Sequence, residues 1–373
     1  MRTLQPIALW VSLGLFGLAV ACQSGPSTDN VSPTAPNTTI PGSSTGITYQ
    51  STPLNFTKPA NFPDPVYDLA KNPLTAEGVD LGRMLFYDVT LSSNGLISCA
   101  FCHIQGSAFS HTDHPLSHGV GDKNGPRNVP AVQNVAWDNH FFWDGGIKDL
   151  DLLPIAPIEN PVEMGERMPN VLARLQNSNK YPALFLAAFG SKEITSERFL
   201  KALSQFMITM VSANTKYDHY VRKEAGGDMT AQELQGLTLF KQNCATCHAG
   251  ELFTDQNFRN NGLGVNPNVV PEDLGRYQVT LNEADKRKFR VPSLRNVART
   301  QPYMHDGRFS TLEQVIKHYA TGVVDNPSLD PLLKKNGQVG IPLSTQDQEA
   351  IIAFLYTLTD FSYVNDPRFG PIR

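Results

Sequence analysis

The sequence predicts a mainly α-helical protein in which one structural plan is used twice. The first observation is a pentad, Cys-Ala-Phe-Cys-His at residues 99–103, which returns as Cys-Ala-Thr-Cys-His at residues 244–248. The second is a Gly-x-x-Leu-Phe pattern ahead of each pentad, at residues 82–86 and 236–240. The third is an amphipathic segment that follows each pentad after a long irregular stretch. Each half is therefore expected to run helix, pentad, loops and closing helix.

The helix before the second pentad has a recognisable start. Thr230 and Glu233 form a capping-box pattern, in which each side chain accepts a hydrogen bond from the other residue's backbone. Leu234, Leu237 and Phe240 are expected near one face of the helix that follows.

The closing helices are predicted within residues 195–212 and residues 344–360, where apolar residues recur at helical spacing. We interpret these apolar stripes as core rather than as cofactor contacts. The expected core positions are Phe199, Leu203, Phe206 and Met210 in the first helix and Ile351, Phe354, Leu355 and Leu358 in the second.

The N-terminus indicates export. Residues 1–21 open with Arg2 and continue as a short apolar run, which is typical of a secretory signal peptide. Small residues precede Cys22 as at a bacterial lipoprotein processing site, so Cys22 is predicted to be lipidated; the alternative is an ordinary signal peptide with an incidental cysteine. Residues 22–55, with many Ser, Thr and Pro residues, are expected to form a flexible tether. The predicted location is the periplasm or cell envelope, anchored by lipid to a membrane, and Gln23 favours the outer membrane.

The composition of the whole chain is that of a globular protein, with 40% hydrophobic and 18% charged residues and a formal net charge of −4. Nothing forms a basic stripe, so no nucleic-acid partner is expected. The 373 residues suffice for two domains with a core each. The boundary is predicted near residues 222–228, which places the N-terminal domain at residues 56–224 and the C-terminal domain with its tail at residues 225–373.

Each pentad has the chemistry of a c-type haem attachment site. Two thiols at this spacing add to the two haem vinyl groups, and the following histidine lies beneath the iron as its proximal ligand. A zinc site and a thioredoxin-like pair are alternatives, but neither requires a histidine directly after each CxxC. Five cysteines are present, so Cys22 and the pentads leave none for a disulfide. The predicted attachment residues are Cys99, Cys102, Cys244 and Cys247, and the predicted proximal ligands are His103 and His248.

Three longer stretches connect the chain to a known family. They read NGPRNVPAVQNVAWDNHFFWDGG, APIENPVEMG and KFRVPSLRNVARTQPYMHDGRFSTLEQVIKHY. They resemble the bacterial di-haem cytochrome c peroxidase and MauG superfamily, over roughly residues 60–362. The resemblance implies two cytochrome c-like domains, each wrapping one covalently attached c-type haem with long loops.

The resemblance also implies groups above the first haem. Glu163 matches the family's distal glutamate, which takes a proton from one peroxide oxygen and passes it to the other. Glu159 is a second carboxylate expected to share that pocket. His118 matches a movable histidine that caps the first iron until reduction activates the enzyme. His111 and His114 are its neighbours, and some family members keep this haem open.

Trp143 matches the tryptophan that lies between the two haems in the family, although a core tryptophan is the alternative. At the position of the peroxidases' distal methionine the chain has Tyr319, which is the pattern of the MauG-like branch, where a tyrosine ligates the second iron. His318 and Met304 are the alternative ligands, and a further alternative is that no residue ligates here and Tyr319 is an ordinary half-buried helix tyrosine. Neighbouring residues on a helix point about 100° apart, so only one of His318 and Tyr319 can face the iron.

A calcium ion is a further implied cofactor. Asn128, Thr300 and Pro302 match the positions that supply it, the last two through backbone carbonyls. The motifs PRNVPAVQNVA and VPSLRNVARTQPY look like echoes of each other, and Asn128 and Asn296 are expected to hold equivalent turns.

The function predicted from these residues is that of a peroxidase. Hydrogen peroxide would be reduced to water at the N-terminal haem, with electrons delivered through the C-terminal haem from a small c-type cytochrome or cupredoxin. Two haems suit this reaction because peroxide takes two electrons while such donors each give one. The alternatives are a MauG-like oxidase acting on a protein or small organic substrate, and a non-catalytic di-haem electron carrier. A homodimer is compatible with each of these hypotheses.

Overall fold

The computed structural model describes residue 49, residues 51–335 and residues 337–372. These residues belong to one compact unit, Thr48–Arg373. The predicted signal peptide, the lipidation site Cys22 and most of the tether lie outside the described residues, so those assignments stay predictions. Among the helices that are described, none is long and apolar enough to cross a membrane.

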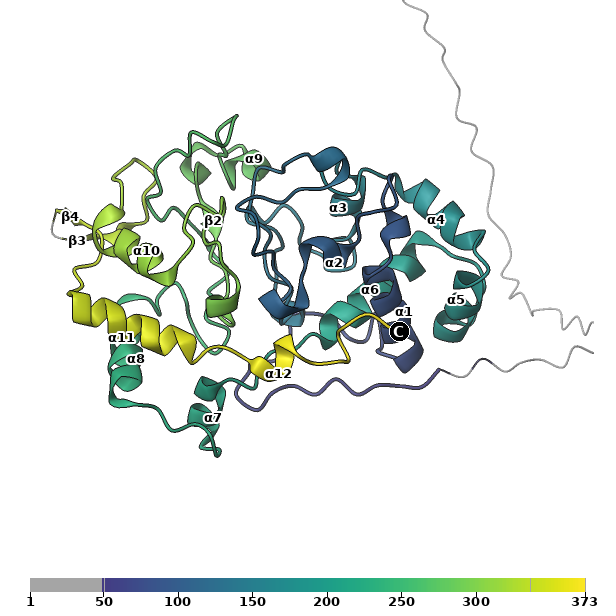
Figure 1. Cartoon of the computed structure of the whole chain (residues 1–373), viewed down its shortest axis with the longest axis horizontal. Coiled ribbons are helices and arrows are strands. Elements are labelled where there is room, and N and C mark those ends of the chain that lie inside the picture. The colour runs from purple at the N-terminus through teal and green to yellow at the C-terminus, as the bar shows by residue number, and fades with distance from the viewer. Residues whose placement is uncertain (1–48, 50, 336, 373) are drawn as a thin grey trace, which may run out of the picture. The chain divides into compact units, whose positions relative to one another are not determined.

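Helices and long loops make up most of the described chain, and each strand is only two residues long (Figure 1). The helices are α1 Ala76–Phe86, α2 Cys99–Cys102, α3 Ile155–Glu159, α4 Met168–Gln176, α5 Tyr181–Phe189, α6 Ser196–Thr209, α7 Lys216–Arg222, α8 Ala231–Asn243, α9 Tyr277–Thr280, α10 Leu312–Lys317, α11 Thr345–Tyr356 and α12 Phe361–Val364. The strands form two antiparallel pairs, β1 Phe258–Arg259 with β2 Phe289–Arg290 and β3 Lys334–Lys335 with β4 Gln338–Val339. The predicted fold class, mainly α with long loops, is confirmed.

The pattern that occurs twice in the sequence corresponds to the same kind of helix contact in each half of the chain. Helix α1 packs against α6, and α8 packs against α11 (Figure 1). A Cβ atom on Gly82 would lie 1.9 Å from the carbonyl oxygen of Ala202, and one on Gly236 would lie 1.9 Å from that of Ala350. The glycine of each Gly-x-x-Leu-Phe pattern therefore lets two helix backbones approach more closely than any side chain would allow.

Gly236→Ala is expected to lower the free energy of unfolding by about 1–3 kcal/mol, because the added methyl group must push α8 away from α11. The usual gain in helix propensity from Gly to Ala, up to about 1 kcal/mol, acts in the opposite direction and is outweighed. Denaturant unfolding measures the change. Gly106→Ala is the control, since nothing lies within 4 Å of a Cβ atom there; equal stability of the two variants would contradict the contact.

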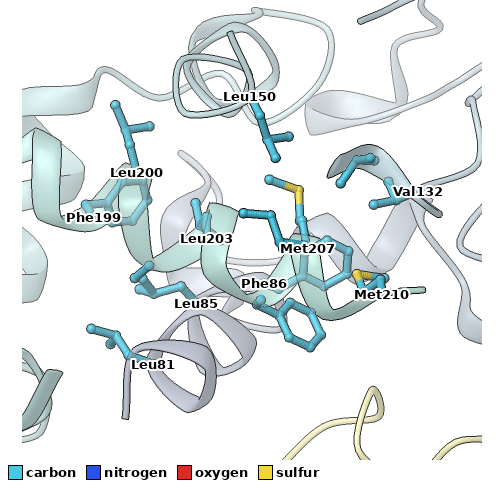
Figure 2. Close-up of a cluster of buried hydrophobic side chains, with 14 of the residues drawn as sticks. Leu81, Leu85, Phe86, Val132, Leu150, Phe199, Leu200, Leu203, Met207 and Met210 are labelled. Carbon is cyan, nitrogen blue, oxygen red and sulfur yellow. The ribbon is translucent and has the colours of Figure 1, made fainter. Parts of the chain in front are cut away.

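Two hydrophobic clusters form the core. The first surrounds α1 and α6, and Figure 2 shows Leu81, Leu85 and Phe86 from α1 beside Leu203 and Met207 from α6. The second surrounds α8 and α11. All eight core positions predicted for the closing helices are buried: Phe199, Leu203, Phe206, Met210, Ile351, Phe354, Leu355 and Leu358.

The three apolar residues predicted near one face of α8 are not equally buried. Leu237 and Phe240 are buried, but Leu234 is 38% exposed. Two residues along a helix correspond to a rotation of about 200°, so Leu234 lies on the side opposite Gly236, which faces α11. The close approach at Gly236 decides which face of α8 is buried.

The C-terminal tail returns to the first cluster. Tyr363, Val364 and Phe369 are buried there, and the Tyr363 hydroxyl donates a hydrogen bond of 2.6 Å to the carbonyl oxygen of Val132. The Tyr87 hydroxyl donates to the carbonyl oxygen of Phe369 at 2.8 Å. The tail therefore packs with residues far from it in sequence, and the predicted division at residues 224 and 225 stays a prediction.

The expectation that Asn128 and Asn296 hold equivalent turns is wrong. The residue equivalent to Asn296 in the first loop motif is Asn134. Both residues have left-handed backbones, with φ of 56° and 57°, and each precedes a short 3₁₀ turn. Asn134 Oδ1 accepts from the Ser212 backbone at 2.8 Å, and Asn296 Oδ1 accepts from the Asp360 backbone at 2.7 Å. Each asparagine thus ties its loop to the segment that follows a closing helix, a role that Asn128 does not have.

Candidate functional site

The two pentad histidines are held in the same way. His103 Nδ1 lies 2.7 Å from the carbonyl oxygen of Phe109, and His248 Nδ1 lies 3.1 Å from that of Phe253. Both phenylalanines have positive φ, 58° and 54°, so each loop turns back beneath its histidine. Burial lowers the pKa of both imidazoles, that of His103 to about 4. A neutral ring whose Nδ1 donates to a carbonyl has its Nε2 lone pair free for a metal.

The pentad cysteines are unsuited to thiol redox chemistry. None of the four forms a disulfide. Burial raises the pKa of Cys99, Cys102 and Cys244 to about 12 and that of Cys247 to about 11. A catalytic dithiol needs a lowered pKa, because the thiolate is the nucleophile. The environment therefore disfavours a thioredoxin-like pair and is compatible with thioether attachment of haem.

A cavity of about 270 Å³ lies beside the second pentad. Its walls include Cys244, Cys247 and His248 on one side and Met304 and Tyr319 from later segments. Two thiols and a histidine at the edge of an otherwise largely apolar hollow are the donor set that a covalently attached haem requires. The second site therefore fits the haem that the pentad predicts.

Tyr319 and His318 point to different places. Tyr319 lines the cavity, whereas the buried His318 is not among the lining residues and has its Nε2 3.0 Å from the carbonyl oxygen of Asn261. These residues lie in a π-helical turn, His318–Gly322, at the end of α10. Burial raises the pKa of Tyr319 to about 12, so the phenol is neutral unless a cation lowers that pKa.

Asn261 is a site residue that the sequence did not reveal. Its side chain lies near Tyr319 and acts to lower the pKa of that phenol, its Nδ2 donates to Met304 Sδ at 3.4 Å, and its backbone carbonyl faces His318. It therefore contacts all three candidate ligands of the second iron. No motif or periodicity marks it, because its contacts come from segments far along the chain.

Trp143 lies on the wall of the same cavity and reaches it from the N-terminal half of the chain. Its Nε1 donates a hydrogen bond of 2.9 Å to the carbonyl oxygen of Asn128. Asn128, Thr300 and Pro302 also line this cavity, so the structure brings the three candidate calcium ligands to one region. Their neutral oxygens are of the type that calcium accepts, and the calcium site stays a prediction.

Around the first pentad, the structure brings together Glu163, Cys102 and the backbone of His118. Cys102 Sγ lies 3.6 Å from the carbonyl oxygen of His118, and the charge of Glu163 contributes to the raised pKa of Cys102. The backbone of Val120 donates to the carbonyl oxygen of Glu163 at 2.8 Å. Burial raises the pKa of Glu163, while a 2.9 Å hydrogen bond from Asn160 Nδ2 to its Oε1 lowers it.

Two other candidate groups for the first haem site, the Glu159 carboxylate and the His118 imidazole, have different surroundings. Glu159 is exposed, and its Oε1 accepts from the backbone of Met168 at the start of α4, so the expectation that it shares the Glu163 pocket is wrong. The His118 imidazole lies among His111 and His114, and one ring nitrogen of each of the three lies within 4.8 Å of the others.

The chain is similar to proteins of one family. The family model described as di-haem cytochrome c peroxidase matches residues 76–226. The methylamine utilization protein MauG of Methylorubrum extorquens is 36% identical over 308 residues, which cover 81% of this chain and 83% of MauG. The cytochrome c551 peroxidase of Nitrosomonas europaea is 34% identical over 293 residues, which cover 78% of this chain and 82% of the peroxidase.

Solved structures agree with these relatives. A MauG-like protein associated with microbial copper homeostasis has a TM-score of 0.76 and 34% identity, and the match covers 85% of this chain and 99% of that one. The di-haem peroxidase BthA from Burkholderia thailandensis shares the fold, with a TM-score of 0.68 at 24% identity over 80% of this chain and 91% of its own. The chain therefore belongs to the di-haem cytochrome c peroxidase and MauG family.

Proposed function

We propose that this protein is a di-haem c-type peroxidase that reduces hydrogen peroxide to water. A small c-type cytochrome or cupredoxin supplies the electrons through the second haem. The observation that carries this proposal is the partly buried carboxylate of Glu163 beside the first pentad, because a pure electron carrier has no use for an acid–base group there. The coarser assignment, an oxidoreductase of a family that has two c-type haems, follows from membership of the family.

The pentads name the residues that would hold the haems, and when bound the haems supply redox-active iron at each site. Cys99, Cys102 and His103 would hold the first. Cys244, Cys247 and His248 would hold the second.

The chain's own contribution to the first site is proton transfer. An ionised Glu163 carboxylate accepts a proton from one peroxide oxygen and returns it to the other, so that the departing oxygen leaves as water. Asn160 holds Oε1 of this carboxylate and favours its ionised form. Trp143, fixed by its hydrogen bond to Asn128, would offer an aromatic ring between the two sites.

The test is peroxide-dependent oxidation of a reduced small cytochrome c by the haem-loaded protein. It is run once from the fully ferric protein and once after reduction by one electron. Turnover in either run supports a peroxidase. A requirement for prior reduction would indicate that a ligand must leave the first iron, for which His118 is the candidate. Absence of turnover in both runs would contradict the peroxidase.

A second candidate, a MauG-like oxidase, is favoured by one observation. Tyr319 and Met304 both line the cavity beside His248, but the Met304 sulfur already accepts a hydrogen bond from Asn261. A phenolate stabilises ferric and higher oxidation states of iron, whereas a thioether favours ferrous iron. Such a protein would withdraw electrons from a protein or small organic substrate, and the similarity to MauG agrees with this alternative.

Tyr319→Phe is expected to raise the reduction potential of the second haem and to change its absorption spectrum, because the variant cannot supply an anionic oxygen ligand. Spectroelectrochemical titration measures both effects. Tyr356→Phe, which alters a tyrosine that is 57% exposed, is the control. A spectrum and a potential that are unchanged in Tyr319→Phe would rule out ligation by Tyr319.

The pH dependence of turnover should report on Glu163. Only the ionised carboxylate accepts a proton, so turnover falls as the pH drops through the pKa of Glu163, which burial holds above its ordinary value. Asn160→Ala removes a hydrogen bond that lowers this pKa, so the acid limb of the profile should move to higher pH. Asn170→Ala is the control, because it removes the same kind of bond from Glu166, outside the site. Identical profiles for the two variants would contradict the assignment.

We also propose export to the periplasm or cell envelope with a lipid anchor on Cys22. Incorporation of labelled fatty acid by the wild type, and its loss in Cys22→Ser, tests the anchor. A homodimer remains a hypothesis for light scattering to test.

A further inference from the structure

Three histidines in the loop after the first pentad form a compact group. His111, His114 and His118 each place one ring nitrogen within 4.8 Å of the other two. Their ring centroids are 5.2, 5.7 and 4.6 Å apart, and their planes are inclined to one another by 63–66°. The rings therefore converge from three directions on one point.

This geometry is close to that of a three-imidazole metal site. Zinc lies about 2.1 Å from a histidine nitrogen, so two nitrogens on one tetrahedral ion are about 3.4 Å apart and the centroids of their rings about 5 Å apart. His111 Nε2 and His114 Nδ1 are already 3.1 Å apart. The His118 nitrogen lies within 4.8 Å of the other two ligand nitrogens, at most about 1.4 Å more than two ligands on one ion, so a small movement of this ring would complete the set.

The protein satisfies the hydrogen-bonding groups of these rings only in part. His111 is only 4% exposed, and within the described part of the chain its buried Nδ1 has no hydrogen-bond partner. The Nε2 of His111 faces His114 Nδ1, so one of these two nitrogens must be protonated and donate a hydrogen bond to the other. His118 Nδ1 lies 3.5 Å from the carboxylate of Asp122, which is longer than a good hydrogen bond.

The surroundings allow an ion to reach the three histidines and to take a fourth ligand. His114 is exposed, so the group opens to solvent. Asp122, next to His118, offers an oxygen ligand for a fourth position, which water could also fill. Imidazole donors select zinc, copper or nickel over magnesium or calcium, which prefer oxygen.

We propose that His111, His114 and His118 bind one late first-row divalent transition-metal ion, such as zinc, in addition to the two haem irons. The ion would hold His118 in this group. A histidine engaged there cannot also cap the first iron, a consequence that rests on the proposed function, whereas the metal site itself does not.

The test is calorimetric titration of zinc into the haem-loaded protein, purified without a polyhistidine tag and freed of metal by chelator. The wild type should bind one zinc ion at this site. His114→Gln and, separately, His118→Gln should each weaken binding by roughly tenfold or more, because each removes a direct ligand. His140→Gln is the matched control, since His140 is a partly exposed histidine outside the group.

Haem content and circular dichroism equal to those of the wild type establish that a variant is folded. His118→Gln gives a second variant should His114→Gln fail this check. A dissociation constant for zinc above about 1 mM in the wild type would overturn the proposal. Equal affinity in the wild type and in both histidine variants would overturn it as well, because the ion would then be bound elsewhere. None of these readouts uses peroxide, so they remain decisive even if the peroxidase assay gives no turnover.

Discussion

Glu163→Gln is expected to lower peroxide turnover by about 10²–10⁴-fold. The amide has nearly the shape of the carboxylate but cannot accept a proton, so the transfer between the two peroxide oxygens loses its base. Glu163 lies beside Cys102 and the backbone of residues 118–120, where burial raises its pKa. Steady-state oxidation of reduced cytochrome c measures the loss.

Glu159→Gln is the matched control for this variant. Glu159 is a nearby carboxylate that is exposed and caps α4, so its replacement should leave turnover close to that of the wild type. Equal haem content in both variants, read from the pyridine haemochrome spectrum, separates catalysis from cofactor loading. Turnover in Glu163→Gln that matches the control would leave this residue without a catalytic role and would favour the electron carrier.

Asp218→Ala is expected to lower the free energy of unfolding by about 3–5 kcal/mol. The Asp218 and Arg295 side chains are both fully buried and are joined by two hydrogen bonds of 2.8 Å. Burial raises the pKa of Asp218, but the hydrogen bonds from Arg295 outweigh it and lower the pKa to about 2. Removing the carboxylate leaves the guanidinium charged, buried and without its counter-ion.

The loss of stability in Asp218→Ala should also affect the second haem site. Arg295 Nε donates to the carbonyl oxygen of Glu251 at 2.7 Å, and its guanidinium lies 4.4 Å above the ring of Phe62. The pair thus fastens the loop after the second pentad to α7. Denaturant unfolding followed through the haem absorbance measures the effect.

Glu197→Ala is the control for this buried pair. Glu197 forms an ion pair with Lys201, and its side chain is 72% exposed, so the loss should stay below about 1 kcal/mol. A loss of that small size in Asp218→Ala would show that water reaches Arg295 once the carboxylate is removed.

Periodic and strictly local features could be predicted from the sequence. The closing helices and their eight buried positions follow from apolar spacing alone, and the capping box at Thr230 forms as expected. The features that the sequence did not predict share one cause. Leu234 is exposed because of a contact between two helices, and Glu159 is drawn to the start of a helix that no local pattern assigns to it.

The mainly helical fold and the candidate haem-attachment residues could be predicted from the sequence, because helical periodicity and CxxCH spacing act over a few neighbouring residues. Which of His318 and Tyr319 faces the second cavity depends on contacts between distant segments, namely the π-helical turn and the contacts of Asn261, and these place Tyr319 there. Only the tertiary structure decided that three histidines of an irregular loop converge. Such loops have no repeat in sequence, and their conformation is set by hydrogen bonds to distant segments, as between Val120 and Glu163.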